Sequence, residues 1–253
     1  MKKEERQIQI QKMLNSTGTV TVSEIVNALC VSDMTVRRDL AEMAEQGILI
    51  RTHGGAQRVL GEDNGLERSH QEKKHLQEAE KTAIAKTAAD FIPDGETIFL
   101  GLGTTMELLA GCLRHRTMRI VTNSLPVFEI LRFCKTVDLL LVGGEYRSIT
   151  GAFVGMTSVQ AIQNMRFAKI FISANGIVGN NVYTYSEAEG EVQKTALNNA
   201  NRKYLVTDAS KFGRYDFYEF CKVSDFDHVI TDAGVDENTL QQLRSLSDVI
   251  IAS

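Results

Sequence analysis

Residues 21–58 read TVSEIVNALCVSDMTVRRDLAEMAEQGILIRTHGGAQR, and this stretch decides the fold of the N-terminal part of the chain. It opens on a T-x-x-E capping box, in which the Thr21 hydroxyl accepts a hydrogen bond from the backbone N–H of Glu24 and the Glu24 side chain reaches back. A first helix is therefore expected to begin there and to break at Cys30. Ser32 is a suitable cap for a second helix. Two helices joined by so short a turn predict a helix-turn-helix unit.

The second helix carries an apolar stripe, because Val36, Leu40 and Met43 recur at helical spacing. Side chains off this stripe lie near the N-terminus of the helix, the part of a recognition helix that points at bases and phosphates. Arginine bonds a guanine edge or neutralises a phosphate, and threonine bonds a phosphate or touches a thymine methyl. The candidate DNA contacts on this helix and its cap are Ser32, Met34, Thr35, Arg37 and Arg38.

Residues 48–58 follow the second helix and have the pattern strand, glycine turn, strand, which predicts a wing. Arg51, His53 and Arg58 on this wing would join the helix arginines in a local basic patch. The alternative is a helix-turn-helix that serves protein contacts, with its arginines solvated at the surface. The cap, the stripe and the wing together favour DNA binding.

The composition is that of a globular protein with one or two domains, since 43% of the 253 residues are hydrophobic and 24% are charged. The net charge of −4 excludes a polybasic coat for nucleic acid, so any such site has to be local. The four cysteines are far apart and the histidines lack the spacing of metal ligands, so neither a disulfide scaffold nor a metal site is expected. His70 is interpreted as solvated. Without a secretion signal or a membrane-length apolar run, the protein is expected in the cytoplasm with no membrane partner.

The remainder of the chain alternates short apolar runs with amphipathic segments, the pattern of βαβ units around a mostly parallel sheet covered on both faces. The runs are TIFL (97–100), RIVT (119–122), DLLLV (138–142), KIFIS (169–173), KYLVT (203–207), HVIT (228–231) and DVIIA (248–252). A polar stretch before them is interpreted as a linker that passes into a helix. The expected organisation is a DNA-binding domain at 1–58, a linker at 59–78 and an α/β effector-binding domain at 79–253.

The strand expected at 97–100 leads into a glycine-rich loop and a helical pattern, an arrangement that binds anions. The loop offers Gly101, Gly103, Thr104 and Thr105, and the first N–H groups of the helix complete a phosphate cradle. Met106 stands where a dinucleotide fingerprint has its third glycine, and no G-K-[ST] follows as in a Walker loop. Nucleotide cofactors are therefore disfavoured, and no cofactor is expected.

Four other strand ends carry comparable polar residues. Because ligands bind outside the carboxyl ends of the strands in open α/β sheets, these residues are candidates for one common pocket. Ordinary turns rich in Gly, Asn and Asp are the alternative interpretation. The candidates are Asn123, Ser124, Gly143, Gly144, Asn175, Gly176, Asp208 and Lys211.

These motifs resemble those of the DeoR family of bacterial transcription regulators. The resemblance covers essentially the whole chain and rests on VSDMTVRRDL (31–40) with HGGA (53–56), followed by GLGTT, TNS, GGE, SANG and DASKFG. It implies a winged helix-turn-helix joined to a sugar-phosphate-sensing domain related to ribose-5-phosphate isomerase, in a protein that usually represses and often forms tetramers. The same resemblance implies that the five later blocks line the pocket, with Asp208 near sugar hydroxyls and Lys211 near the phosphate.

Lys73 and Lys81, between the two domains, are further candidate contacts for an anionic effector, although solvated surface positions explain them equally well. The stretches 122–131 and 143–150, together with Gln193, resemble the lactose phosphotransferase system repressor branch of the family in Gram-positive bacteria. That branch implies tagatose 6-phosphate or a similar effector and control of lactose or galactose catabolism. At 189–193 this chain has EGEVQ where many members have EAEVK, so no charged contact is carried over to Gln193.

Three functions stay open on the sequence. In the leading hypothesis, a dimer or tetramer represses by binding operator DNA, and a phosphorylated sugar weakens that binding through residues 59–81. The second is an isomerase-like enzyme that uses Asp208, Lys211 and Glu189, but no catalytic set is evident and the DNA-binding arm would be unexplained. In the third, the ligand strengthens DNA binding.

Overall fold

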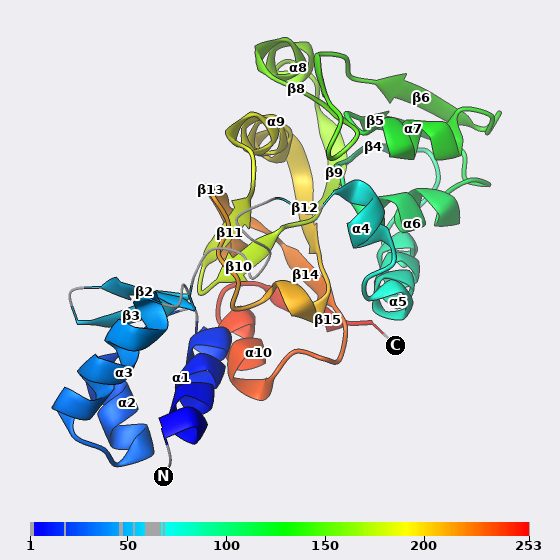
Figure 1. Cartoon of the computed structure of the whole chain (residues 1–253). Coiled ribbons are helices and arrows are strands. Elements are labelled where there is room, and N and C mark those ends of the chain that lie inside the picture. The colour runs from blue at the N-terminus through cyan, green and yellow to red at the C-terminus, as the bar shows by residue number, and fades with distance from the viewer. Residues whose placement is uncertain are drawn as a thin grey trace.

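The structure is a computed structural model, shown in Figure 1. The residues that it describes are 3–17, 19–45, 48–52, 54–58, 67 and 69–252. Their buried apolar side chains form three clusters. One is confined to residues 10–56, and the other two lie on opposite faces of a sheet between residues 84 and 252.

The N-terminal part is three helices and a small antiparallel sheet, and it confirms the predicted winged helix-turn-helix. Its elements are α1 (Lys3–Thr17), β1 (Thr19–Thr21), α2 (Val22–Leu29), α3 (Asp33–Glu45), β2 (Leu49–Thr52) and β3 (Gly55–Arg58). The strands pair in the order β1-β3-β2. Strand β1 has no counterpart in the sequence prediction, because three residues give too short a pattern to identify.

The helix boundaries follow the local chemistry that the sequence indicated. Thr21 and Glu24 form the reciprocal capping box that starts α2, with 3.2 Å between the Glu24 N–H nitrogen and the Thr21 hydroxyl. Helix α2 ends where Cys30 turns left-handed, at a φ of 53°. The Ser32 hydroxyl then accepts from the N–H of Thr35 at 3.3 Å at the start of α3.

The C-terminal part is built on a seven-stranded sheet in which every pairing is parallel, in the order β15-β14-β12-β9-β4-β5-β6. All seven predicted apolar runs are strands of this sheet. Their bounds are β4 (Thr97–Leu100), β5 (Met118–Thr122), β6 (Val137–Leu141), β9 (Phe167–Ile172), β12 (Ala200–Val206), β14 (His228–Thr231) and β15 (Asp248–Ile251). The predicted α/β class with a mostly parallel sheet is confirmed.

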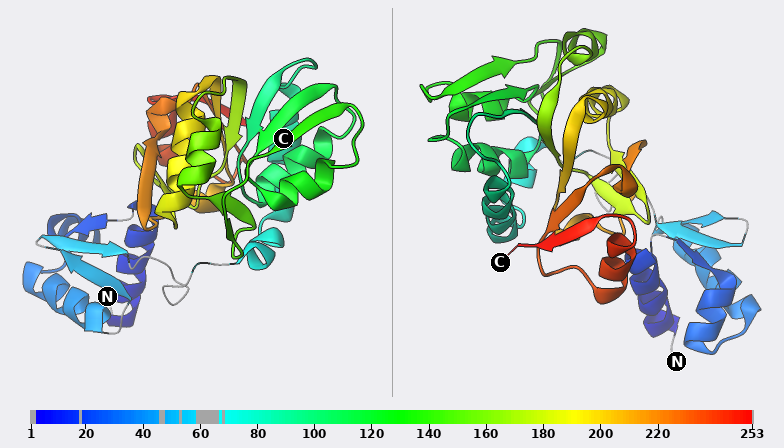
Figure 2. Two further views of the ribbon diagram at one scale, coloured as in Figure 1. Left: turned by 90° about the horizontal axis from the view of Figure 1, so that it is seen from above. Right: turned by 180° about the vertical axis from the view of Figure 1, so that it is seen from behind.

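Helices cover both faces of this sheet (Figures 1 and 2). One face packs against α5 (Glu78–Asp90), α6 (Thr104–Cys112) and α7 (Leu125–Leu131). The other face packs against α8 (Met156–Ile162), α9 (Glu187–Asn198) and α10 (Glu237–Arg244). The short helix α4 (His70–Lys74) precedes α5 and contacts α6.

Two antiparallel additions extend from the ends of the parallel strands, where the sequence pattern predicted no strands. One is the hairpin of β7 (Glu145–Arg147) and β8 (Ala152–Val154). The other is a sheet ordered β10-β11-β13, made of β10 (Gly176–Val178), β11 (Asn181–Thr184) and β13 (Tyr218–Lys222). Short 3₁₀ turns at Ala209–Lys211 and Val223–Asp225 complete the elements.

Candidate functional site

Two adjoining hollows form one cavity near the point where the strand order of the parallel sheet reverses direction. They share the lining residues Lys73, Lys81, Asn175, Asp208 and Lys211. The chain runs from β4 to β5 and β6 on one side and from β9 to β12 and β14 on the other. Loops that follow β4, β9 and β12 meet beneath α4 and α5. Such a reversal leaves a crevice at the carboxyl ends of the strands, which is where open α/β sheets bind ligands.

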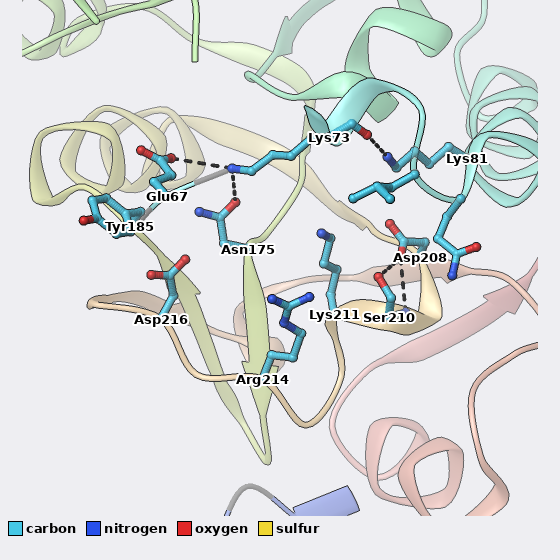
Figure 3. A pocket seen from close by; sticks show the side chains of 12 residues that line it. Glu67, Lys73, Lys81, Asn175, Tyr185, Asp208, Ser210, Lys211, Arg214 and Asp216 are labelled. Atoms are coloured by element: carbon cyan, nitrogen blue, oxygen red, sulfur yellow. Dashed lines mark hydrogen bonds and ion pairs between the residues drawn. The ribbon is translucent and has the colours of Figure 1, made fainter. Parts of the chain in front are cut away.

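Three lysines from separate segments point into this cavity (Figure 3). Lys73 of α4 lies 3.3 Å from the side-chain oxygen of Asn175 and 3.5 Å from a carboxylate oxygen of Glu67. Lys81 of α5 is only 3% exposed and donates to the backbone carbonyl of Lys73 at 2.7 Å. Burial lowers the pKa of Lys81. The solvated interpretation of Lys73 and Lys81 is therefore not what the structure shows.

Lys211 is the third lysine, and its amine has no hydrogen-bond partner among the described residues. Burial lowers its pKa to about 8, against the nearby Asp208 carboxylate, which favours the charged form. Asp208 is itself 2% exposed and accepts from the N–H of Ser210 at 3.1 Å. The pocket therefore holds a cation without a direct bonding partner, as a site for an anion does.

The N-terminus of α6 faces the same cavity. The cap residue Gly103 has a φ of +117°, which favours glycine, and it supplies no side-chain cap. The first N–H groups of a helix have no partner within the helix, so those after Gly103 are available to an anion. Thr104 and Thr105 add hydroxyls to the lining. Gly101 has a different role, since an added Cβ would lie 2.9 Å from the Ile172 side chain.

A buried network of ion pairs and hydrogen bonds supports another wall of the cavity, which Glu67, Thr150 and Thr184 line. Arg147 bonds a carboxylate oxygen of Glu189 at 3.1 Å and also pairs with Glu67. Thr150 and Thr184 both donate to Glu189. Burial raises the pKa of Glu189, and the hydrogen bond from Thr150 and the charge of Arg147 oppose that shift. Internal pairing thus holds this wall together and reaches Lys73 through Glu67, whereas Lys211 has no such partner among the described residues.

Several residues that line the cavity were not among the sequence candidates. They are Glu67, His70, Thr150, Ser173, Thr184, Tyr185, Gln193, Ser210, Arg214 and Asp216. His70 bonds Glu107 and is only partly exposed, so its interpretation as solvated is wrong. Proximity in sequence was the available signal for Arg214 and Asp216, which directly follow the DASKFG block, and for His70, which lies on the same short helix as Lys73.

The structure brings only part of the predicted pocket set together. Gly103, Thr104, Thr105, Asn175, Asp208, Lys211, Lys73 and Lys81 line the cavity. Gly101, Asn123, Ser124, Gly143, Gly144 and Gly176 do not, and effector contact by them stays a prediction.

Most residues of this second set have local structural roles. The Asn123 side chain donates to the carbonyl of Phe153 at 2.9 Å, and the Ser124 hydroxyl caps α7. An added Cβ on Gly144 would lie 2.1 Å from the Ser158 hydroxyl. An added Cβ on Gly176 would lie 2.2 Å from the carbonyl oxygen of Arg214. These residues shape the loops around the pocket.

The second candidate site is the exposed face of α3. Val36, Leu40 and Met43 are at most 1% exposed, as the stripe predicted, while Met34 is 77% exposed. Arg37 is paired with Asp33 at 2.5 Å. Arg38 is exposed, and none of the described residues bonds its guanidinium. This face offers one arginine held in place and one free to meet a phosphate or a base.

The remaining DNA candidates lie at the start of α3 and on the wing. Ser32 and Thr35 share a hydroxyl contact of 2.8 Å at the N-terminus of α3. Arg51 is exposed on β2, and Arg58 belongs to β3. His53 lies outside the described residues. Within the described residues, no group of three or more His, Cys, Asp or Glu is arranged to hold a metal ion, and no helix is long and apolar enough to cross a membrane.

Comparison with known proteins gives two family matches that together span most of the chain. The DeoR-like helix-turn-helix domain matches residues 6–60, and the DeoR C terminal sensor domain matches residues 76–233. The chain is 47% identical to a lactose phosphotransferase system repressor of Lactococcus lactis, over 100% of both proteins. It is 45% identical to a protein of the same name from Streptococcus mutans, over 99% of this chain and 100% of the relative.

Solved structures resemble the chain more distantly. Ribose 5 phosphate isomerase A from Neisseria gonorrhoeae matches with a TM-score of 0.38 and 16% identity, over 52% of each chain.

Proposed function

The protein belongs to the DeoR family of transcription regulators, and from this premise we propose that it represses a lactose or galactose catabolic operon until a phosphorylated sugar releases it from operator DNA. The helix-turn-helix domain binds the DNA and the sensor domain binds the small-molecule effector. In the proposed division of the chain, residues 1–58 form the DNA-binding domain, 59–78 the linker and 79–253 the effector-binding domain.

The names of the full-length relatives support the choice of pathway, since both of those compared above are lactose phosphotransferase system repressors. Their names also speak against the isomerase-like enzyme, because they describe repressors. We propose tagatose 6-phosphate as the effector, in keeping with the lactose branch. The regulator would act in the cytoplasm as a dimer or tetramer, because two copies of α3 are needed to read two operator half-sites.

The observation that carries the effector proposal is the convergence of Lys73, Lys81 and Lys211 with the N-terminus of α6 on one cavity. Burial lowers the pKa of Lys81 and of Lys211. A dianionic phosphate would pair with the charged forms of these amines and so raise their pKa values again. Nearby Asp208 and Asn175 offer acceptors for sugar hydroxyls.

The test is isothermal titration of tagatose 6-phosphate into the full-length protein and into the Lys81→Met variant. Methionine keeps most of the length of the buried side chain and removes the charge, so we expect at least a tenfold loss of affinity for the sugar phosphate. Operator affinity without ligand should stay unchanged, because Lys81 lies in the sensor domain.

The matched control is Lys86→Met, which removes an exposed lysine from the same helix and should leave both affinities unchanged. Equal affinity of wild type and Lys81→Met for the sugar phosphate would contradict the proposed site. Loss of DNA binding together with ligand binding in Lys81→Met would contradict the division of labour between the domains.

A further inference from the structure

Gln193 on α9 is buried without a partner at the edge of the effector cavity. Its side chain is 2% exposed, and its amide oxygen is fully enclosed with no hydrogen bond. None of the described residues bonds the rest of the amide either. The residue nevertheless lines the same cavity as Thr104 and Lys211. A buried amide without partners is costly, so this group is arranged to meet something that enters the cavity.

The cavity that Gln193 lines has hydroxyl groups and a nearby buried carboxylate in addition to its lysines. Thr150 and Thr184 line the cavity beside it, and both donate to the buried carboxylate of Glu189, one helical turn earlier in α9. Arg147 is committed to Glu189 and Glu67 by ion pairs. Glu189 is 1% exposed, so a phosphate directly beside Gln193 would lie near a buried carboxylate, which is unfavourable for a dianion.

The unpaired amide oxygen requires a hydrogen-bond donor. A phosphate dianion has no proton to donate, whereas a sugar hydroxyl both donates to the amide oxygen and accepts from the amide N–H. Resting on the proposed function, we propose that Gln193 reads a hydroxyl of the effector's carbon chain while the lysines and α6 hold its phosphate. Gln193 is thus a specificity residue for neutral, polyhydroxylated sugar monophosphates, as opposed to bisphosphates or phosphorylated sugar acids.

The experiment compares two probes, tagatose 6-phosphate and inorganic phosphate, by titration calorimetry on wild type, Gln193→Met and Gln193→Leu. Both variants fill the site with apolar atoms and remove every hydrogen bond. We expect about a tenfold loss of affinity for the sugar phosphate, the size of one hydrogen bond with its buried partner, and no change for inorganic phosphate. Gln160→Met, on the exposed side of α8, is the matched control and should alter neither affinity.

Thermal denaturation without ligand separates a ligand-reading role from a structural one. Because the amide makes no bond in the unliganded protein, Gln193→Met should be as stable as wild type or more stable. A lower midpoint in both variants would mean that Gln193 holds the structure together, and would overturn the inference.

Equal losses for the two probes, or no loss for either, would also overturn it. Failure of wild type to bind the sugar phosphate is a separate result, because it removes the proposed effector and the role of Gln193 falls with it. Binding by wild type with no effect of Gln193→Met contradicts the inference alone.

Discussion

Lys211 is the residue whose charge decides how the pocket responds to pH. Its pKa is lowered to about 8 by burial, while Asp208 acts in the opposite direction and Arg214, Lys73 and Lys81 add to the lowering. The amine is therefore mostly charged at pH 7 and mostly neutral at pH 9. A sugar phosphate is a dianion throughout that range, because its second pKa is about 6.

We predict that affinity for the sugar phosphate falls about tenfold between pH 7 and pH 9, following the loss of the charged form of Lys211. Affinity falls as the pH rises because the phosphate binds the protonated amine more tightly than the neutral amine. The protein therefore takes up protons when it binds the sugar phosphate near pH 8. Calorimetry in buffers of different ionisation enthalpy measures that uptake. Lys211→Arg stays charged and should show little change, whereas an equally steep decline in that variant would assign the effect to another group.

At the residue scale, the sequence motifs located much of the lysine side of the pocket and little of the wall that the ion-pair network supports. Asp208 and Lys211 follow one strand in a recognisable block, so their position at its carboxyl end was predictable. Glu67, Arg147 and Gln193 come from the segment before α4, a short hairpin and the middle of a helix. Their meeting depends on how those elements fold back, which local sequence does not encode.

At the scale of elements, Gly55 is the residue that lets strand β3 of the wing pack closely against β1. It pairs with Thr21 across β1 and β3, where an added Cβ would lie 1.9 Å from the carbonyl oxygen of Val20. The neighbouring Gly54 has nothing within 4 Å of the same position. The two adjacent glycines of the HGGA stretch therefore differ in what they tolerate.

We predict that Gly55→Ala lowers the free energy of unfolding of the N-terminal domain by about 3 kcal/mol, at the upper end for overpacking, and abolishes operator binding. Gly54→Ala should cost less than about 1 kcal/mol and retain DNA binding. Urea denaturation followed by circular dichroism measures both values. Similar behaviour of the two variants would show that the β1–β3 contact does not hold the wing.

The exposed face of α3 gives a second prediction at this scale. Arg38→Ala should weaken operator binding and reduce the slope of log affinity against log salt by about 1, the effect of one lost phosphate contact. Lys12→Ala removes an exposed basic residue from α1 and serves as the control. An unchanged salt slope in Arg38→Ala, measured by fluorescence anisotropy across a salt series, would remove Arg38 from the phosphate contacts.

Elements with strong patterns were predictable and short ones were not. Each apolar run of four or five residues is a strand of the parallel sheet, because such runs between helical patterns are typical of sheets covered by helices on both faces. Strands β7, β8 and β10 have three residues each, which is too short for a recognisable alternation of apolar and polar residues. The order of the seven strands is likewise set by packing and not by any one segment.

For the whole molecule, the coupling between ligand and DNA has a contact through which to act. The segment 214–216 alternates its side chains, since Arg214 and Asp216 line the effector cavity while Tyr215 shares a side-chain hydrogen bond with Thr19 of β1. Figure 1 shows the winged domain next to α10 and close to β10 and β11 of the sensor domain. The route proposed from the sequence, through residues 59–81, lies partly outside the described residues.

We predict that Tyr215→Phe reduces the factor by which tagatose 6-phosphate changes operator affinity, because it removes the hydrogen bond to Thr19 and keeps the ring. Affinity for each ligand alone should change less than about threefold. Tyr146→Phe on the exposed hairpin strand β7 is the control. The factor is the same whether the sugar or the DNA is titrated, so a Tyr215→Phe variant with the wild-type factor in both titrations would exclude this contact from the coupling.

The central claim, a repressor released by a sugar phosphate, is tested most directly by fluorescence anisotropy of the protein's own promoter DNA at fixed ionic strength. Tagatose 6-phosphate is titrated into the preformed complex. The account predicts saturable release of the DNA. After correction for competition by DNA, the sugar-phosphate affinity derived from this release should equal the affinity measured by calorimetry. Retention of the DNA at saturating sugar phosphate, or tighter binding, would contradict it.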